Sequence, residues 1–114
     1  MASYGGVPGV QYDDMTVNGS TDVYAYADWA TTIDFYQSLV PGVPKTYYTI
    51  YLQFWTGSSW SNVDSKVGYF QYNVTRSFSL AGRSEGYYRI RGLYRKEGYT
   101  DYNVNITNSF YVNR

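Results

Sequence analysis

Apolar and polar residues alternate at every second position along most of the chain, and this period limits the fold more than any other feature. The clearest case is the segment 47–55, whose apolar side holds Tyr48, Ile50, Leu52 and Phe54 and whose other side holds Tyr47, Thr49, Tyr51, Gln53 and Trp55. Successive side chains of a β-strand point to opposite faces, whereas a helix needs apolar spacing of 3.6 residues, which no segment shows convincingly. The pattern predicts an all-β protein.

Shorter alternating segments and turn signals divide the rest of the chain. Strands are expected around 23–29, 31–35, 60–63, 69–80, 88–91, 102–106 and 110–112. The run 41–44 (PGVP) breaks the sheet, and 56–59 (TGSS) has the composition of a hairpin loop. We therefore expect one domain over residues 1–114, an antiparallel β-sandwich of seven to nine strands, with a loose segment at 1–8.

One local motif indicates the type of sandwich. Leu80 and the run 84–90 (SEGYYRI) resemble the E–F corner of immunoglobulin-like domains, in which a tyrosine begins strand F. The resemblance makes Tyr88 the corner tyrosine. Ile90 stands where antibody domains have their second cysteine, so the resemblance implies an immunoglobulin-like architecture without antibody-type recognition.

Sixteen tyrosines, no histidine and no cysteine restrict the chemistry of the chain. The chain has no imidazole base, no thiolate nucleophile and no zinc or iron site of the ordinary ligand types. Glycoside hydrolysis needs two carboxylates at a set separation, which nothing in the sequence predicts. We expect a binding protein, not an enzyme, with no cofactor. A calcium site from Asp13, Asp14 and either Asp22 or Asp101 would lack EF-hand spacing.

The formal net charge is zero, which gives no reason to expect nucleic acid as a partner. The charge is nevertheless unevenly distributed, because six of the nine acidic residues precede position 65 and eight of the nine basic residues follow it. Neighbouring strands of one molecule can neutralise each other. The alternative is head-to-tail attraction between subunits. No apolar run approaches the roughly 20 residues of a membrane helix.

Two features favour a secreted bacterial protein. The chain lacks the disulfides that small secreted eukaryotic domains usually carry, and we interpret the start at Met1-Ala2 as an addition before a mature terminus. In addition, 51–60 (YLQFWTGSSW) and 86–89 (GYYR) resemble a family of small secreted Gram-positive proteins with the pattern Y-L-Q-x-W-x-G-x-x-W followed by G-x-Y-R. The resemblance implies export and no particular biochemical role.

Exposed aromatic rings favour carbohydrate as the ligand, because a flat ring covers the apolar face of a sugar while nearby polar groups bind its hydroxyls. The candidate ligand-binding residues are Tyr47, Tyr51, Trp55 and Trp60. The alternative is that cross-strand tyrosine and threonine pairs only stabilise the outer face of a sheet.

The second class of function is protein–protein contact or self-assembly, because tyrosine, tryptophan and arginine are enriched at interface hot spots. Arg89, Arg91 and Arg95 align on one side of a predicted strand, and they are the candidate interface residues. They could meet carboxylates of a partner or of a neighbouring subunit, or they could pair within the same molecule.

Overall fold

The computed structural model describes residues 2–4, 16–23, 25–40, 45–100 and 102–114. Among these residues no helix is long and apolar enough to cross a membrane. They form ten strands: β1 (Ser3–Tyr4), β2 (Thr16–Thr21), β3 (Ala25–Tyr26), β4 (Thr32–Val40), β5 (Thr46–Trp55), β6 (Trp60–Phe70), β7 (Asn73–Ser79), β8 (Gly86–Lys96), β9 (Asn103–Ile106) and β10 (Phe110–Val112).

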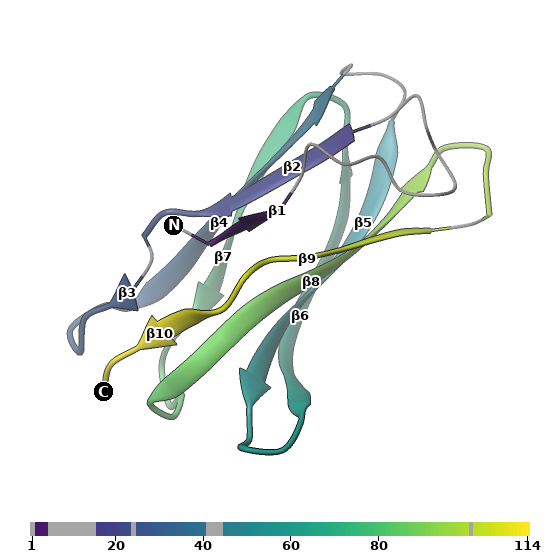
Figure 1. Ribbon diagram of the computed structural model, residues 1–114. Helices are drawn as coiled ribbons and strands as arrows, with labels where there is room; N and C mark the ends of the chain where they lie inside the picture. The colour runs from purple at the N-terminus through teal and green to yellow at the C-terminus, as the bar shows by residue number, and fades with distance from the viewer. Residues whose placement is uncertain (1, 5–15, 24, 41–44, 101) are drawn as a thin grey trace.

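The strands form the two layers of a β-sandwich (Figure 1). The four-stranded sheet has the order β1-β2-β4-β7, and the six-stranded sheet has the order β3-β10-β8-β5-β6 with β9 paired to β8. All pairs are antiparallel except β3 with β10, which is parallel. The all-β sandwich is as predicted.

The strand count exceeds the expected seven to nine because β1 and β2 lie before residue 23, where the sequence predicted no strand. β9 and β10 both pair with β8 and are separated where the Thr107 hydroxyl accepts a hydrogen bond from the Ile90 amide, 2.9 Å away. Within the segment 1–8, β1 pairs with β2, Ala2 is buried, and its amide donates to the Thr21 hydroxyl at 3.0 Å. Positions 1 and 5–8 lie outside the described residues.

The predicted faces hold for the long central strands and fail at the edges. In β5 the side chains of Tyr48, Ile50 and Leu52 are buried as predicted. In β3 the small-residue side faces outward and Tyr26 is buried, because this edge strand lasts only two residues before the turn at 27–30. In β9 the apolar residues at 104 and 106 are exposed, and the segment 69–80 is split between the two sheets by a turn that leaves Tyr72 exposed.

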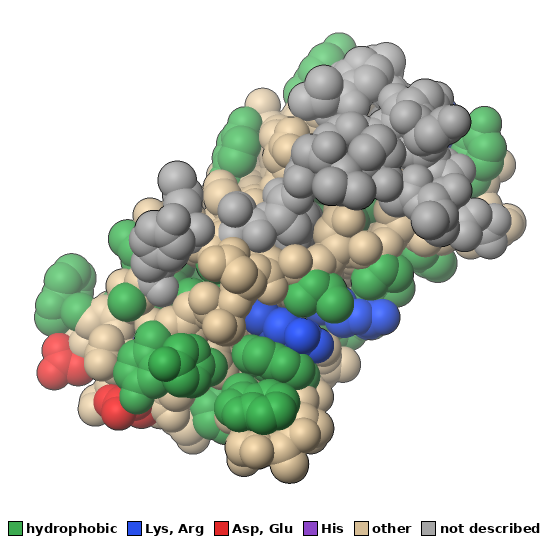
Figure 2. Space-filling model, in the orientation of Figure 1, with side chains coloured by type: hydrophobic (Ala, Val, Ile, Leu, Met, Phe, Trp, Pro, Cys, Tyr) green, Lys and Arg blue, Asp and Glu red, His purple; other side chains and the backbone are tan. Residues whose placement is uncertain are grey.

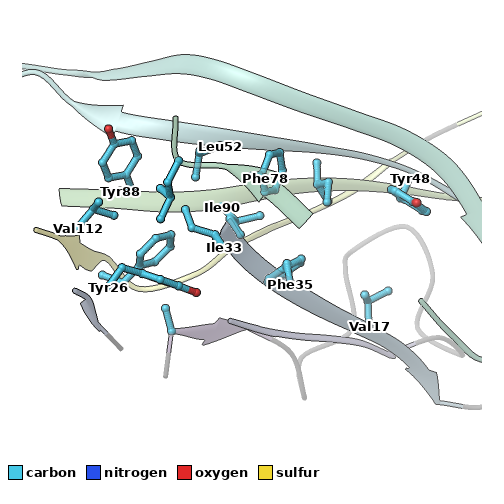
Figure 3. Packing of buried hydrophobic residues seen from close by; sticks show 14 of the residues in the cluster. Val17, Tyr26, Ile33, Phe35, Tyr48, Leu52, Phe78, Tyr88, Ile90 and Val112 are labelled. Carbon is cyan, nitrogen blue, oxygen red and sulfur yellow. The ribbon is translucent and has the colours of Figure 1, made fainter. Parts of the chain in front are cut away.

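The core lies between the two sheets (Figure 3). The inward side chains that Figure 3 labels come from both layers: Val17, Ile33, Phe35 and Phe78 from the four-stranded sheet, and Tyr26, Tyr48, Leu52, Tyr88, Ile90 and Val112 from the six-stranded sheet. Because alternate residues fill this space, the intervening residues of the central strands necessarily point to solvent. These intervening residues make the candidate functional surface.

Candidate functional site

The outward side of β5, β6, β8 and β10 carries all seven residues that the sequence predicted for function. Buried and partly exposed positions alternate along β8 and along β5 as far as Leu52, which places 47 and 51 of β5 and 89, 91 and 95 of β8 on one face. Trp55 lies on the same face, because its ring contacts Trp60 and the Arg89 guanidinium lies over Trp60. We call the outward side of these four strands the binding face. The two predicted sites, proposed as alternatives, therefore share one surface.

Four aromatic side chains form a row across the binding face, one from each strand: Trp60 of β6, Trp55 of β5, Tyr87 of β8 and Tyr111 of β10. The rings of Trp55 and Trp60 have centroids 5.4 Å apart, and those of Tyr87 and Tyr111 are 4.9 Å apart. With strands about 4.8 Å apart, the row spans roughly 14 Å. We call these four residues the aromatic row. In Figure 2 hydrophobic side chains gather at the lower end of the molecule, over β8 and β10, beside lysine or arginine side chains.

A tight hairpin places the two tryptophans opposite each other. The Thr56 amide donates to the Ser59 carbonyl at 2.9 Å, and Gly57 has a φ of 101°, which favours glycine. This turn makes Trp55 and Trp60 register partners. Two positions on, a register shift between Leu52 and Gln53 changes the pairing of β5 with β6.

An open hollow of about 280 Å³ lies at the centre of the aromatic row and is lined by Trp55, Trp60, Tyr87 and Ser109. The Trp55 and Tyr87 side chains retain 37% and 52% of their solvent exposure. The apolar ring surfaces are therefore accessible to a ligand, and Ser109 offers a hydroxyl at the border.

A chain of hydrogen bonds holds Arg89 against the aromatic row. Its Nε donates to Gln53 Oε1 at 2.7 Å, and Gln53 Nε2 donates to Asn62 Oδ1 at 2.9 Å. The Arg89 guanidinium carbon lies 4.4 Å from the centre of the Trp60 ring, within cation–π distance. Partial burial, with a smaller contribution from the Arg91 charge, lowers the pKa of Arg89. The charge is therefore fixed in position beside the tryptophan pair.

The other predicted ligand residues lie away from the tryptophans. Tyr47 is eight positions from Trp55 along β5, about 26 Å at the rise of an extended strand. It belongs to a second cluster, with the Tyr69 ring 6.1 Å away, the Arg95 guanidinium 4.5 Å from the Tyr47 ring centre, and the Lys45 amine 4.1 Å from the Tyr69 ring centre. Tyr51 lies between the clusters, opposite Arg91 of β8. The four predicted ligand residues are thus on one face but do not form one platform.

The sequence prediction missed the contribution of Tyr87 and Tyr111 to the ligand surface. Tyr87 stands outward by the same alternation that buries Tyr88, so its orientation could be inferred locally. Tyr111 could not be assigned to the row, because its place depends on β10 pairing with β8 across 24 residues of sequence.

Acidic residues contribute little to the binding face. The described residues contain no group of three His, Cys, Asp or Glu that could hold a metal ion, and Asp13, Asp14 and Asp101 of the considered calcium site lie outside them. Asp22 lies on the other side of the sandwich, where it accepts hydrogen bonds from the Tyr26 hydroxyl and from the Asp34 amide. Burial and the Asp22 carboxylate raise the pKa of Tyr26.

Comparison of the chain with protein-family models, curated proteins and solved structures gave no match.

Proposed function

We propose that this domain is a non-catalytic binding module, secreted or displayed on a bacterial cell surface, that holds a carbohydrate or cell-wall glycan on the aromatic row. The observation that supports this proposal is the pair of accessible tryptophans at 5.4 Å with a guanidinium fixed 4.4 Å from one of them. The resemblance of segments 51–60 and 86–89 to small secreted Gram-positive proteins belongs to the same proposal.

The chemistry of the aromatic row suits a sugar chain. Tryptophan and tyrosine rings cover the apolar C–H face of a pyranose, and the row is long enough for more than one ring in sequence. Asn62 and Arg89 lie directly beside it and carry the amide and guanidinium groups that bind hydroxyls, and the buried Gln53 connects the two. An extended, shallow surface of this kind favours a polymer over a small molecule, which would need an enclosing pocket.

Binding without hydrolysis is part of the proposal. The carboxylate beside the aromatic row in the described part of the chain is Glu85, which accepts hydrogen bonds from the Tyr111 hydroxyl at 3.0 Å and from the Arg114 amide at 2.8 Å. These bonds lower the pKa of Glu85, the Arg114 amide most strongly, and so favour its charged form. Glycoside hydrolysis needs a second carboxyl group and a raised pKa on one of the two.

Pull-down on insoluble polysaccharides and peptidoglycan, together with tryptophan fluorescence on soluble glycans, tests the proposal. We expect saturable binding by the wild-type protein and loss of binding in Trp55→Ala and Trp60→Ala, with the cooperative melting transition retained. Trp29→Ala is the matched control, because Trp29 is 81% exposed on the turn before β4 and lies off the binding face. Binding that survives both tryptophan substitutions, or a clean absence across the panel, would refute the proposal.

Self-assembly is the second candidate function, because the two outer faces carry opposite charges. Asp22 and Asp34 share a hollow on the four-stranded sheet with Tyr36 and Thr75, whereas the binding face carries arginines. Two copies could stack through these faces, and salt would weaken the contact. Size-exclusion chromatography with light scattering at low and high salt should then show an oligomer that dissociates as salt rises; a monomer at low salt rejects this candidate.

A further inference from the structure

The arginines of the binding face lack acidic partners within the described residues. The two ion pairs found there are Lys45–Glu97, at 4.0 Å, and Arg83–Asp64, at 2.9 Å, and neither includes Arg89, Arg91 or Arg95. The charge imbalance between the two halves of the chain is therefore not neutralised on this surface by neighbouring strands.

Arg91 has uncharged neighbours on both sides. Its register partners are Tyr51 on β5 and Ile106 on β9, and it stands two positions from Arg89 on the same face of β8, roughly 7 Å along the strand. Two guanidinium groups at this spacing repel each other unless a negatively charged group that contacts both of them offsets the repulsion. The β5 residues paired with Arg91 and Arg89 are Tyr51 and Gln53, and neither carries a negative charge.

The arrangement of rings and charges gives the ligand its chemical class. We infer that the binding face takes an anionic polysaccharide, whose sugar rings lie on the aromatic row and whose acidic group binds at Arg89 and Arg91. A guanidinium matches the two oxygens of a carboxylate or the oxygens of a phosphate, and Arg89 is held in place for this contact by Gln53. This inference rests on the proposed function and adds the charge of the ligand to it.

The probes are two acidic glycans and their uncharged counterparts: polygalacturonate with its carboxyl-reduced form, and phosphomannan with its dephosphorylated form. The first pair tests a carboxylate and the second a phosphate. Affinity electrophoresis at low and high salt measures retention. We expect one or both acidic glycans to be held at least about tenfold more tightly than the uncharged counterpart, and the preference to shrink at high salt.

Three variants separate specific recognition from bulk ion exchange. Arg91→Gln should weaken binding of the preferred acidic glycan roughly tenfold, since a hydrogen bond to a charged group is lost, and should leave the melting transition unchanged. Lys66→Gln is the matched control, because it removes the same charge from the other side of the sheet: Lys66 is the register partner of Ile50, whose side chain faces the core. This variant should change binding less than about twofold. Trp55→Ala should lose the acidic glycan as well.

The possible failures are distinguishable. Equal retention of acidic and uncharged glycans, both lost in Trp55→Ala, would overturn the inference and leave the proposed function standing. Acidic glycan retained equally by wild type and Trp55→Ala, or weakened equally by Arg91→Gln and Lys66→Gln, would show ion exchange and overturn the inference. If none of the four glycans is retained, the inference is rejected. If the pull-down on polysaccharides and peptidoglycan also shows no binding, the proposed function is rejected as well.

Discussion

At the scale of single residues, Tyr88 shows how a polar group is kept in the core. Its ring is buried against Phe54 and Phe110, with centroids 4.9 and 6.4 Å away, and its hydroxyl donates to the Ser84 carbonyl at 2.7 Å. The bond spans the turn before β8, within the run 84–90. One side chain thus fixes the connection between the two sheets.

Replacing Tyr88 by phenylalanine should lower the free energy of unfolding by about 1–3 kcal/mol, because the Ser84 carbonyl loses its partner in a partly buried site. Tyr111→Phe removes a hydroxyl that donates to the exposed Glu85, and it should cost less than about 0.5 kcal/mol. Urea denaturation of both variants measures the difference. Equal losses would show that the corner bond contributes nothing beyond an ordinary surface contact.

At the scale of elements, the pairing of β5 with β6 depends on a close approach at Gly68. A methyl group at this position would lie 2.6 Å from the Tyr48 hydroxyl and 2.9 Å from its Cζ atom. The Tyr48 hydroxyl cannot move freely, because Arg76 of β7 donates to it at 2.6 Å and also donates to the Val67 carbonyl at 3.1 Å. Gly68 therefore leaves room for the contact that joins the edges of the two sheets.

Gly68→Ala should destabilise the fold by roughly 1–3 kcal/mol, as expected for overpacking at a buried ring. Val67→Ala on the same strand is the control, because Val67 is exposed, and it should cost less than about 0.5 kcal/mol. Thermal melts followed by circular dichroism compare the two. If Gly68→Ala has the same melting temperature as the wild type, the Tyr48–Arg76 contact does not constrain β6.

At the scale of the whole molecule, Arg114 joins segments that are far apart in the sequence. Its guanidinium donates to the carbonyls of Asp28 and Ala30 at 3.0 Å each and to that of Leu80 at 3.3 Å, while its amide donates to Glu85. The turn before β4, the turn before β8 and the strand β10 are thereby connected at one end of the sandwich.

Stability should be nearly constant from about pH 5 to pH 9, since the chain has no histidine. Burial raises the pKa of Tyr26 and of Tyr88 above the usual 10.0, so the folded state favours their neutral forms. Their contribution to stability is complete below pH 10 and is lost as the pH rises beyond it. The lowered pKa of Glu85 acts in the opposite range: its contribution is present above the usual 4.5 and is lost as the pH falls.

Urea denaturation as a function of pH checks this profile. Tyr26→Phe should show a smaller alkaline decline than wild type, because one phenol that resists ionisation is removed. A wild-type profile that falls steeply between pH 6 and 8, or an unchanged alkaline decline in the variant, would contradict the assignment.

The amino-acid sequence alone determined which residues of β8, and of β5 as far as Leu52, face the core, and it predicted the hairpin that pairs Trp55 with Trp60. These features depend on period-two alternation and on turn composition, which act over a few residues. Only the tertiary structure decided that Arg89 lies on Trp60, that Tyr111 extends the aromatic row, and that Tyr47 belongs to a separate cluster. Such contacts depend on strand order and register, which follow from how both sheets pack on a shared core.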